Sequence, residues 1–188
     1  VSMPLNIKIN IFGNLKINKT DVETNKPIDN TIFELVDSNG NVIATGTTDN
    51  RGILEFNKIK PGNYKIREKK SNDNYINNNV IYDIVINPSE TSTKNITNEH
   101  KKGNLKIYKV DKDDNDLTLG AVEFDLIDSS GKVVKHLVTD VNGIAEVKNI
   151  NTGNYTLRET LTKKEYNLAI DQNVVINWNE TMEYKVEN

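Results

Sequence analysis

Apolar and polar residues alternate along most of the chain in short stretches, which is the pattern of β-strands with one buried face. These stretches are rich in Ile, Val, Tyr and Thr and are separated by Asn-Gly, Ser-Gly or Pro-Gly dipeptides, which favour turns. No segment keeps a helical period of apolar residues. The pattern predicts an all-β protein with strands near 14–20, 31–37, 41–47, 52–57, 63–69, 80–87, 91–98, 104–110, 121–128, 132–138, 143–148, 154–160, 172–178 and 181–188.

The second seven strands repeat the first seven in sequence as well as in spacing, about ninety residues later. Four blocks recur in order, and the tails ending at Asn98 and Asn188 form a fifth. The paired blocks are 13–19 with 103–109, 33–40 with 124–131, 48–52 with 139–143, and 62–68 with 153–159. The chain is therefore read as a tandem duplication.

Seven short strands in about ninety residues, taken as antiparallel, predict a β-sandwich of immunoglobulin-like architecture in each copy. We expect one domain at 13–98, a linker at 99–102 and a second domain at 103–188. A linker this short predicts a rod with limited bending. Residues 1–12 have no counterpart in the second copy, but their apolar residues alternate, so they are read as a leader or an extra edge strand.

Side chains alternate between the two faces of a strand, so residues two apart share a face. This alternation, called parity below, predicts that three polar side chains of each copy point toward the core. Lys19 follows Leu15 and Ile17 on one face of the first strand. By the same parity Glu68 points inward on the fifth strand and Asn98 on the last. The equivalent residues of the second copy are Lys109, Glu159 and Asn188. The Lys-to-Asn separation is 79 residues in both copies.

Buried charges are costly unless they are paired or neutralised, which leaves two readings of these residues. In the first, Lys and Glu form a buried salt bridge and Asn is a hydrogen-bond partner. In the second, a desolvated lysine is a neutral nucleophile and a desolvated glutamate is a proton donor. The amine then attacks the side-chain carbonyl of Asn, the protonated glutamate hydrogen-bonds the carbonyl oxygen, and ammonia leaves. A Lys–Asn isopeptide bond would remain between the first and last strands.

The order and spacing of the repeated motifs resemble the Cna B-type domain of Gram-positive surface adhesins and pilins. The motifs are Leu-Lys-Ile-x-Lys, Thr-Asp-x-x-Gly, Gly-Asn-Tyr-x-aliphatic-Arg-Glu and a closing aliphatic-x-Asn, found at 13–98 and again at 103–188. The module is also called the SpaA-type or prealbumin-like domain, and the resemblance implies its reverse-immunoglobulin fold. One segment departs from the family, which often has Pro-x-Gly-Tyr after the glutamate. Residues 73–75 and 164–166 keep only the tyrosine, so the conformation of that loop stays open.

The resemblance implies self-catalysed isopeptide bonds from Lys19 to Asn98 and from Lys109 to Asn188. Glu68 and Glu159 would be the proton relays, and no cofactor would be needed. Asn188 is the last residue of the sequence, and chain ends are often poorly ordered. The sequence alone therefore does not decide whether the second bond forms.

As a function, the resemblance implies a stalk segment of an adhesin or pilus protein that projects a ligand-binding region. Such a segment is not an enzyme, since each domain reacts once with itself. The implied location is the cell wall of a Gram-positive bacterium, as a fragment without its signal peptide and sorting motif. The implied partners are neighbouring domains of the same protein and, through another region, host extracellular matrix. We expect a monomer.

Three other functions stay open: a collagen-type matrix-binding module, a polymerising pilin subunit, and an accessory domain of a secreted glycosidase. The pilin reading calls for a sorting signal, and the sequence contains no Leu-Pro-x-Thr-Gly. The glycosidase reading predicts polysaccharide binding and no isopeptide bond.

The amino-acid composition excludes most other kinds of catalytic or binding site. The 188 residues include no cysteine and only two histidines, so thiol catalysis and zinc–thiolate sites are excluded. A net charge of -3 provides no basic surface for nucleic acid, and no apolar run is long enough to span a membrane. The acidic segment 111–116 lacks the glycine and glutamate of a calcium loop and is read as a solvated turn. Trp178 is read as packed at a strand end or domain junction.

Overall fold

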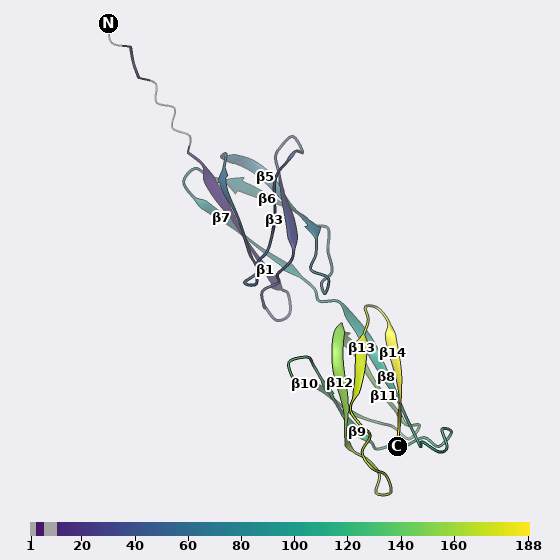
Figure 1. Ribbon diagram of the computed structural model, residues 1–188. Helices are drawn as coiled ribbons and strands as arrows, with labels where there is room; N and C mark the ends of the chain where they lie inside the picture. The colour runs from purple at the N-terminus through teal and green to yellow at the C-terminus, as the bar shows by residue number, and fades with distance from the viewer. Residues whose placement is uncertain (1–2, 6–10) are drawn as a thin grey trace. The chain divides into compact units, whose positions relative to one another are not determined.

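The computed structural model describes residues 3–5 and 11–188 and divides them into two units, one ending at Glu99 and one spanning His100–Asn188 (Figure 1). The prediction of an all-β fold with two tandem seven-stranded sandwiches is confirmed. The edge strand expected within residues 1–12 falls largely on residues 1–2 and 6–10, which lie outside the described residues. No helix in the described part of the chain is long and apolar enough to cross a membrane.

The described residues form fourteen strands, which lie close to the predicted stretches. In the first unit they are β1 (Gly13–Asp21), β2 (Ile32–Val36), β3 (Val42–Thr47), β4 (Ile53–Ile59), β5 (Gly62–Lys70), β6 (Ile81–Ile86) and β7 (Thr91–Asn98). In the second unit they are β8 (Lys102–Val110), β9 (Glu123–Ile127), β10 (Val133–Val138), β11 (Ile144–Asn151), β12 (Gly153–Leu161), β13 (Gln172–Ile176) and β14 (Thr181–Glu187).

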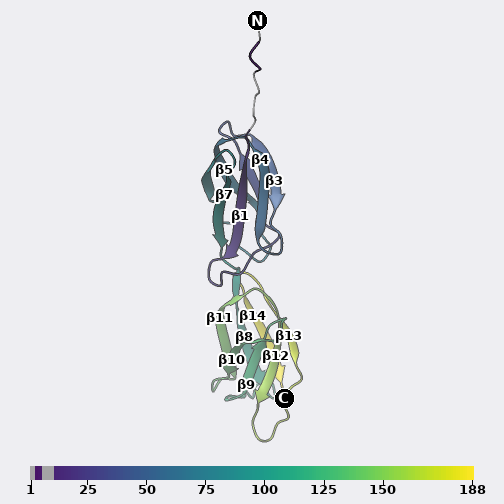
Figure 2. The same cartoon turned by 90° about the vertical axis from the view of Figure 1, so that its left-hand side faces the viewer.

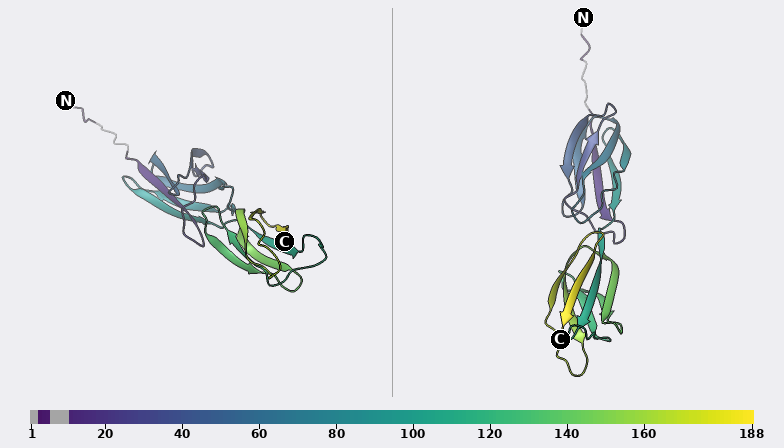
Figure 3. Two further views of the ribbon diagram at one scale, coloured as in Figure 1. Left: turned by 60° about the horizontal axis from the view of Figure 1, so that its bottom comes forward. Right: turned by 90° about the vertical axis from the view of Figure 1, so that its right-hand side faces the viewer.

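Each unit packs a three-stranded sheet against a four-stranded one. The strand orders are β4-β1-β7 and β3-β2-β5-β6 in the first unit, and β11-β8-β14 and β10-β9-β12-β13 in the second. The expectation of wholly antiparallel strands is wrong in one respect, because the first and last strands of each unit pair in parallel. Figure 2 shows β1 and β7 side by side, and the right-hand view of Figure 3 shows the same for β8 and β14. The chain therefore enters a unit at one end of this strand pair and leaves at the other.

The inward faces of the strands form one apolar core in each unit. The burial of β1 alternates residue by residue, as its sequence predicts, with Leu15 and Ile17 fully buried. Phe33, Leu35 and Ile66 meet them from the other sheet. In the second unit the corresponding core residues are Leu105, Ile107, Phe124, Leu126 and Leu157. Burial of each such side chain contributes roughly 1.5–3 kcal/mol to folding.

The repeated Thr-Asp-x-x-Gly block is a turn that supports the end of the first strand. Asp49 Oδ1 accepts hydrogen bonds from the backbone N–H groups of Arg51 and Ile53. Gly52 has a φ of 71°, and its carbonyl accepts the N–H of Lys19 at 2.7 Å. A Cβ at Gly52 would lie 2.3 Å from the Lys19 carbonyl oxygen, so only glycine fits there. Gly143 has the same relation to Lys109 in the second unit.

Candidate functional site

The lysines predicted to point inward are the centre of each candidate site. Lys19 and Lys109 lie on β1 and β8, and neither exposes any of its surface to solvent. Burial lowers the pKa of Lys19 to about 8, and the nearby carboxylates of Glu68 and Asp21 only partly oppose this shift. Burial also lowers the pKa of Lys109, against the opposing carboxylates of Glu159 and Asp111. A larger fraction of each amine is therefore neutral at physiological pH than for an exposed lysine.

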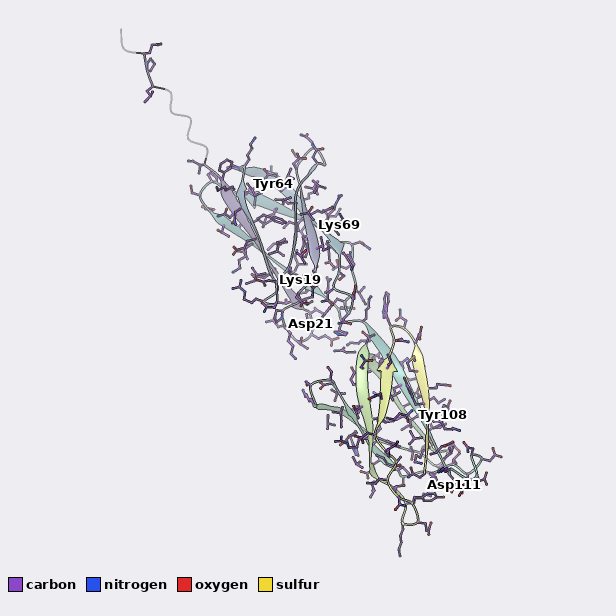
Figure 4. The ribbon with its side chains drawn as sticks, in the orientation of Figure 1. Lys19, Asp21, Tyr64, Lys69, Tyr108 and Asp111 are labelled. Atoms are coloured by element: carbon purple, nitrogen blue, oxygen red, sulfur yellow. The ribbon has the colours of Figure 1, made fainter. Side chains whose placement is uncertain are left out.

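The predicted glutamate and asparagine lie at the same end of each sandwich as the lysine. Glu68 is on β5 of the four-stranded sheet, opposite Phe33 of β2, and is buried. Asn98 ends β7, where it is the parallel partner of Asp21, two residues beyond Lys19. Figure 4 shows Lys19 and Asp21 at the end of the first unit away from Tyr64. The site thus joins the two sheets, with the lysine and the asparagine from one and the glutamate from the other.

The asparagine amide makes the same contacts in both units. Asn98 Nδ2 donates to Glu68 Oε1 at 2.8 Å and to Ser71 Oγ at 2.9 Å. In the second unit, Asn188 Nδ2 donates to Glu159 Oε2 and to Thr162 Oγ1, both at 2.9 Å. This differs from the expected geometry, in which the glutamate faces the amide oxygen. The reason is that the carboxylate and the hydroxyl each accept one hydrogen of the nitrogen, which turns the nitrogen toward them.

Four buried side-chain polar atoms of the described residues have no hydrogen-bond partner, and all four belong to these two sites. They are Lys19 Nζ, Glu68 Oε2, Asn98 Oδ1 and Asn188 Oδ1. An unpartnered buried polar group costs roughly 1–3 kcal/mol, so native proteins seldom keep one without a use. In the first unit every member of the predicted triad carries such an atom.

The second site differs from the first in the partners of its lysine and its glutamate. Lys109 Nζ donates to the backbone carbonyls of Val110 and Val186, at 3.1 and 3.3 Å. Glu159 Oε2 also accepts the N–H of Ala169 at 2.6 Å. The amine of the second site is therefore held by hydrogen bonds, whereas that of the first is not.

A tyrosine–aspartate hydrogen bond fastens the loop after the glutamate strand to the end of the lysine strand. The Tyr75 hydroxyl donates to Asp21 Oδ2 at 2.9 Å, and the Tyr166 hydroxyl donates to Asp111 Oδ2 at 2.7 Å. Burial and the bond to Asp21 both raise the pKa of the Tyr75 hydroxyl. Of the Pro-x-Gly-Tyr motif that often follows the glutamate in the family, this chain keeps only the tyrosine. Its hydrogen bond to the aspartate holds the loop in place although the proline and glycine are absent.

Sequence reasoning missed four members of the sites: Ser71, Thr162, Asp21 and Asp111. Ser71 and Thr162 each stand three residues after the glutamate, just beyond the strand, where parity no longer says which way a side chain points. Comparison of the two copies could have identified these residues, because both copies have a hydroxyl side chain three positions after the glutamate.

The remaining candidates have ordinary surroundings. Asp111 Oδ1 accepts the backbone N–H groups of Asp113 and Asp114 in the acidic turn. No cluster of metal-ligating side chains occurs within residues 3–5 and 11–188. Trp178 is half-exposed beyond the end of β13, with Lys101 Nζ 4.8 Å from its ring centroid.

Comparison with known proteins identifies both units. A family model described as SpaA, a prealbumin-like fold domain, matches residues 13–100 and again 103–188. The serine-aspartate repeat-containing protein F of Staphylococcus epidermidis is 29% identical over 157 residues, covering 72% of this chain and 10% of that protein. The collagen adhesin of Staphylococcus aureus is 36% identical over 77 residues, covering 38% of this chain and 6% of that protein. The chain thus spans a tenth or less of these curated relatives.

Among solved structures, the Bacillus anthracis TIE protein matches with a TM-score of 0.76 and 28% sequence identity. The match covers 94% of this chain and 34% of the TIE chain. The similarity extends through both units, so the tandem arrangement of two such domains also occurs in that protein.

Proposed function

Because the chain belongs to the SpaA family of prealbumin-like domains, structural modules of adhesins and pilins rather than enzymes, we propose that it is a stalk segment stabilised by self-formed isopeptide bonds. The bonds join Lys19 to Asn98 and Lys109 to Asn188. Glu68 and Glu159 relay the proton. The segment stands on the surface of a Gram-positive bacterium, attached to its cell wall, and projects the ligand-binding region of a longer protein.

The observation that carries this proposal is the buried, unpartnered amine of Lys19. A salt-bridge reading would give Lys19 Nζ a carboxylate partner within hydrogen-bond distance, and it has none. Its lowered pKa of about 8 supports a neutral nucleophile instead. The amide that it would attack belongs to the neighbouring parallel strand, at the same end of the sheet.

The reaction balances with the groups at the site. The lysine nitrogen forms a bond to Asn98 Cγ, and the Cγ–Nδ2 bond breaks. Glu68 lies 2.8 Å from Nδ2, so it is placed to give its proton to the departing nitrogen. The carboxylate then regains a proton from the attacking nitrogen. The products are one secondary amide and one ammonia.

The parallel pairing of β1 with β7 makes the position of the bond mechanically useful. A pull on the chain enters the first unit at Gly13 and leaves at Asn98, along two strands that lie side by side. The bond from Lys19 to Asn98 would carry that load directly, so the residues between them would bear none of it. It would also close a loop of about eighty residues, worth roughly 4.5 kcal/mol by the chain-entropy model used for disulfides.

The intact mass of the denatured protein tests the proposal. We expect a deficit of two ammonias against the sequence mass, and none in the Lys19→Ala, Lys109→Ala double variant. A deficit of one would place the bond in a single unit, which peptide mapping identifies. The full sequence mass would refute isopeptide stabilisation and leave the duplicated sandwich as a spacer.

The similarity to a collagen adhesin favours a second candidate function, direct binding of matrix. Binding of the purified chain to immobilised collagen would support that alternative. We expect no binding, because in the proposed role the segment holds the binding region and does not contact the ligand.

A further inference from the structure

We propose that the hydroxyls of Ser71 and Thr162 take part in cross-link formation by fixing the plane of the asparagine amide before it is attacked. This inference rests on the proposed isopeptide bonds. It adds a fourth side chain to each set of lysine, glutamate and asparagine.

The geometry of the amide is the first argument. The two hydrogens of Asn98 Nδ2 have two acceptors, Glu68 Oε1 at 2.8 Å and Ser71 Oγ at 2.9 Å. An amide with a single acceptor can still turn about that hydrogen bond, whereas one with both hydrogens accepted is held in one plane. The attacking amine needs a fixed face of the carbonyl carbon, so holding the plane favours reaction.

The amide oxygen is the second argument. Asn98 Oδ1 is buried and has no partner, so the contacts of its own nitrogen determine the orientation of this side chain. Without the hydroxyl, rotation of the amide would bring Oδ1 toward Glu68, and the nitrogen would then lose its proton donor. The serine therefore keeps the leaving nitrogen next to the acid.

The recurrence of the arrangement is the third argument. Asn188 Nδ2 contacts Glu159 and Thr162 as Asn98 Nδ2 contacts Glu68 and Ser71, and Asn188 Oδ1 is likewise unpartnered. The first unit has a serine and the second a threonine at this position, so the hydroxyl group is the feature that both share. Ser71 follows β5 directly and Thr162 follows β12 directly, so the two strands deliver the hydroxyl from equivalent positions.

In the reaction the hydroxyl forms and breaks no covalent bond. It accepts a hydrogen of Nδ2 while the lysine nitrogen bonds to Cγ, and it releases the nitrogen as ammonia once Glu68 has protonated it. The balance of the reaction is unchanged.

The test compares the two sites within one molecule. The 188-residue chain is isolated in denaturant, checked by mass to retain all its ammonia, and refolded by dilution. Samples are stopped in acid, digested, and each cross-linked peptide is quantified. We expect Ser71→Ala to slow formation of the Lys19–Asn98 bond by about tenfold, as for one lost hydrogen bond to a reacting group. The Lys109–Asn188 bond in the same sample should form at its usual rate. Thr162→Val should have the reverse pattern.

Two further variants separate the hydroxyl from the shape of the side chain. Ser71→Thr should restore the wild-type rate, since Thr162 already serves the second unit, and Ser71→Val should stay slow. Equal rates for Ser71→Ala and wild type, or for Ser71→Thr and Ser71→Val, would overturn the inference. So would a refolding rate, followed by circular dichroism, that falls as much as the cross-linking rate. If the wild type itself loses no ammonia, the proposed function fails instead.

Discussion

The Tyr75 hydroxyl donates a hydrogen bond to Asp21 Oδ2 over 2.9 Å and so joins residues 54 positions apart at the end of the sandwich where the candidate site lies. The other oxygen of Asp21 accepts the backbone N–H groups of Glu23 and Thr24. Burial opposes ionisation of this carboxyl, but the hydrogen bonds from Thr24, Glu23 and Tyr75 outweigh it and lower its pKa. Asp21 is therefore engaged as a carboxylate and leaves Lys19 Nζ without a partner.

Removal of the Tyr75 hydroxyl should weaken the attachment of the loop after β5 to the end of β1. Tyr75→Phe is expected to lower the free energy of unfolding by about 1 kcal/mol, because Asp21 loses a hydrogen bond and the ring remains. Denaturant unfolding measures the change. The matched control is Tyr82→Phe, on β6, whose ring lies 5.3 Å from Lys94 Nζ. Equal losses from both substitutions would show that the hydrogen bond to Asp21 has no special role.

Replacement of Lys19 and Glu68 together by methionine distinguishes the two readings by the sign of its effect. If the isopeptide bond forms, the double variant loses a cross-link and should be less stable by roughly 4 kcal/mol. If the two residues are only a buried ion pair, two apolar side chains of similar size should be neutral or stabilising, whereas removal of the lysine alone would leave the buried glutamate unpaired. Thermal and denaturant unfolding report the sign, and the double variant Lys60→Met, Glu55→Met, at exposed positions, controls for the change of residue type. A more stable Lys19→Met, Glu68→Met protein would contradict the proposal.

The pH dependence of bond formation follows from the lysine and glutamate together. The reactive pair holds one proton, on the glutamate, while the amine is neutral. Above the lysine pKa of about 8 the pair loses that proton, and the leaving nitrogen has no donor. The refolding rate constant for ammonia loss should therefore fall about tenfold per unit as the pH rises above 8. A rate that keeps rising through pH 8 would mean that the neutral amine alone controls the reaction.

The isopeptide bond of the first unit should form before that of the second. Lys109 Nζ must break its hydrogen bonds to the carbonyls of Val110 and Val186 before it attacks, and Lys19 Nζ has none to break. We expect the Lys19–Asn98 bond to form about tenfold faster than the Lys109–Asn188 bond. Peptide mapping during refolding measures both rates in one sample. Formation of the second bond first would show that hydrogen bonding of the amine does not limit the reaction.

The strands and the inward direction of the lysines could be predicted because both depend on local pattern. Leu15, Ile17 and Lys19 must share a face whatever the rest of the chain does. The parallel pairing of β1 with β7 could not be predicted this way, since five intervening strands determine it. The orientation of the Asn98 amide depends on Ser71, a residue beyond the strand end, where alternation provides no guide.

The parallel first and last strands also affect how such a protein changes in length. A chain that crosses each unit from end to end does not have to double back before another copy begins. Recombination between repeats as similar as 13–19 and 103–109 would add or remove about ninety residues at a time and leave every strand pairing within a unit intact. The number of copies can therefore change without any change to the fold of a single unit.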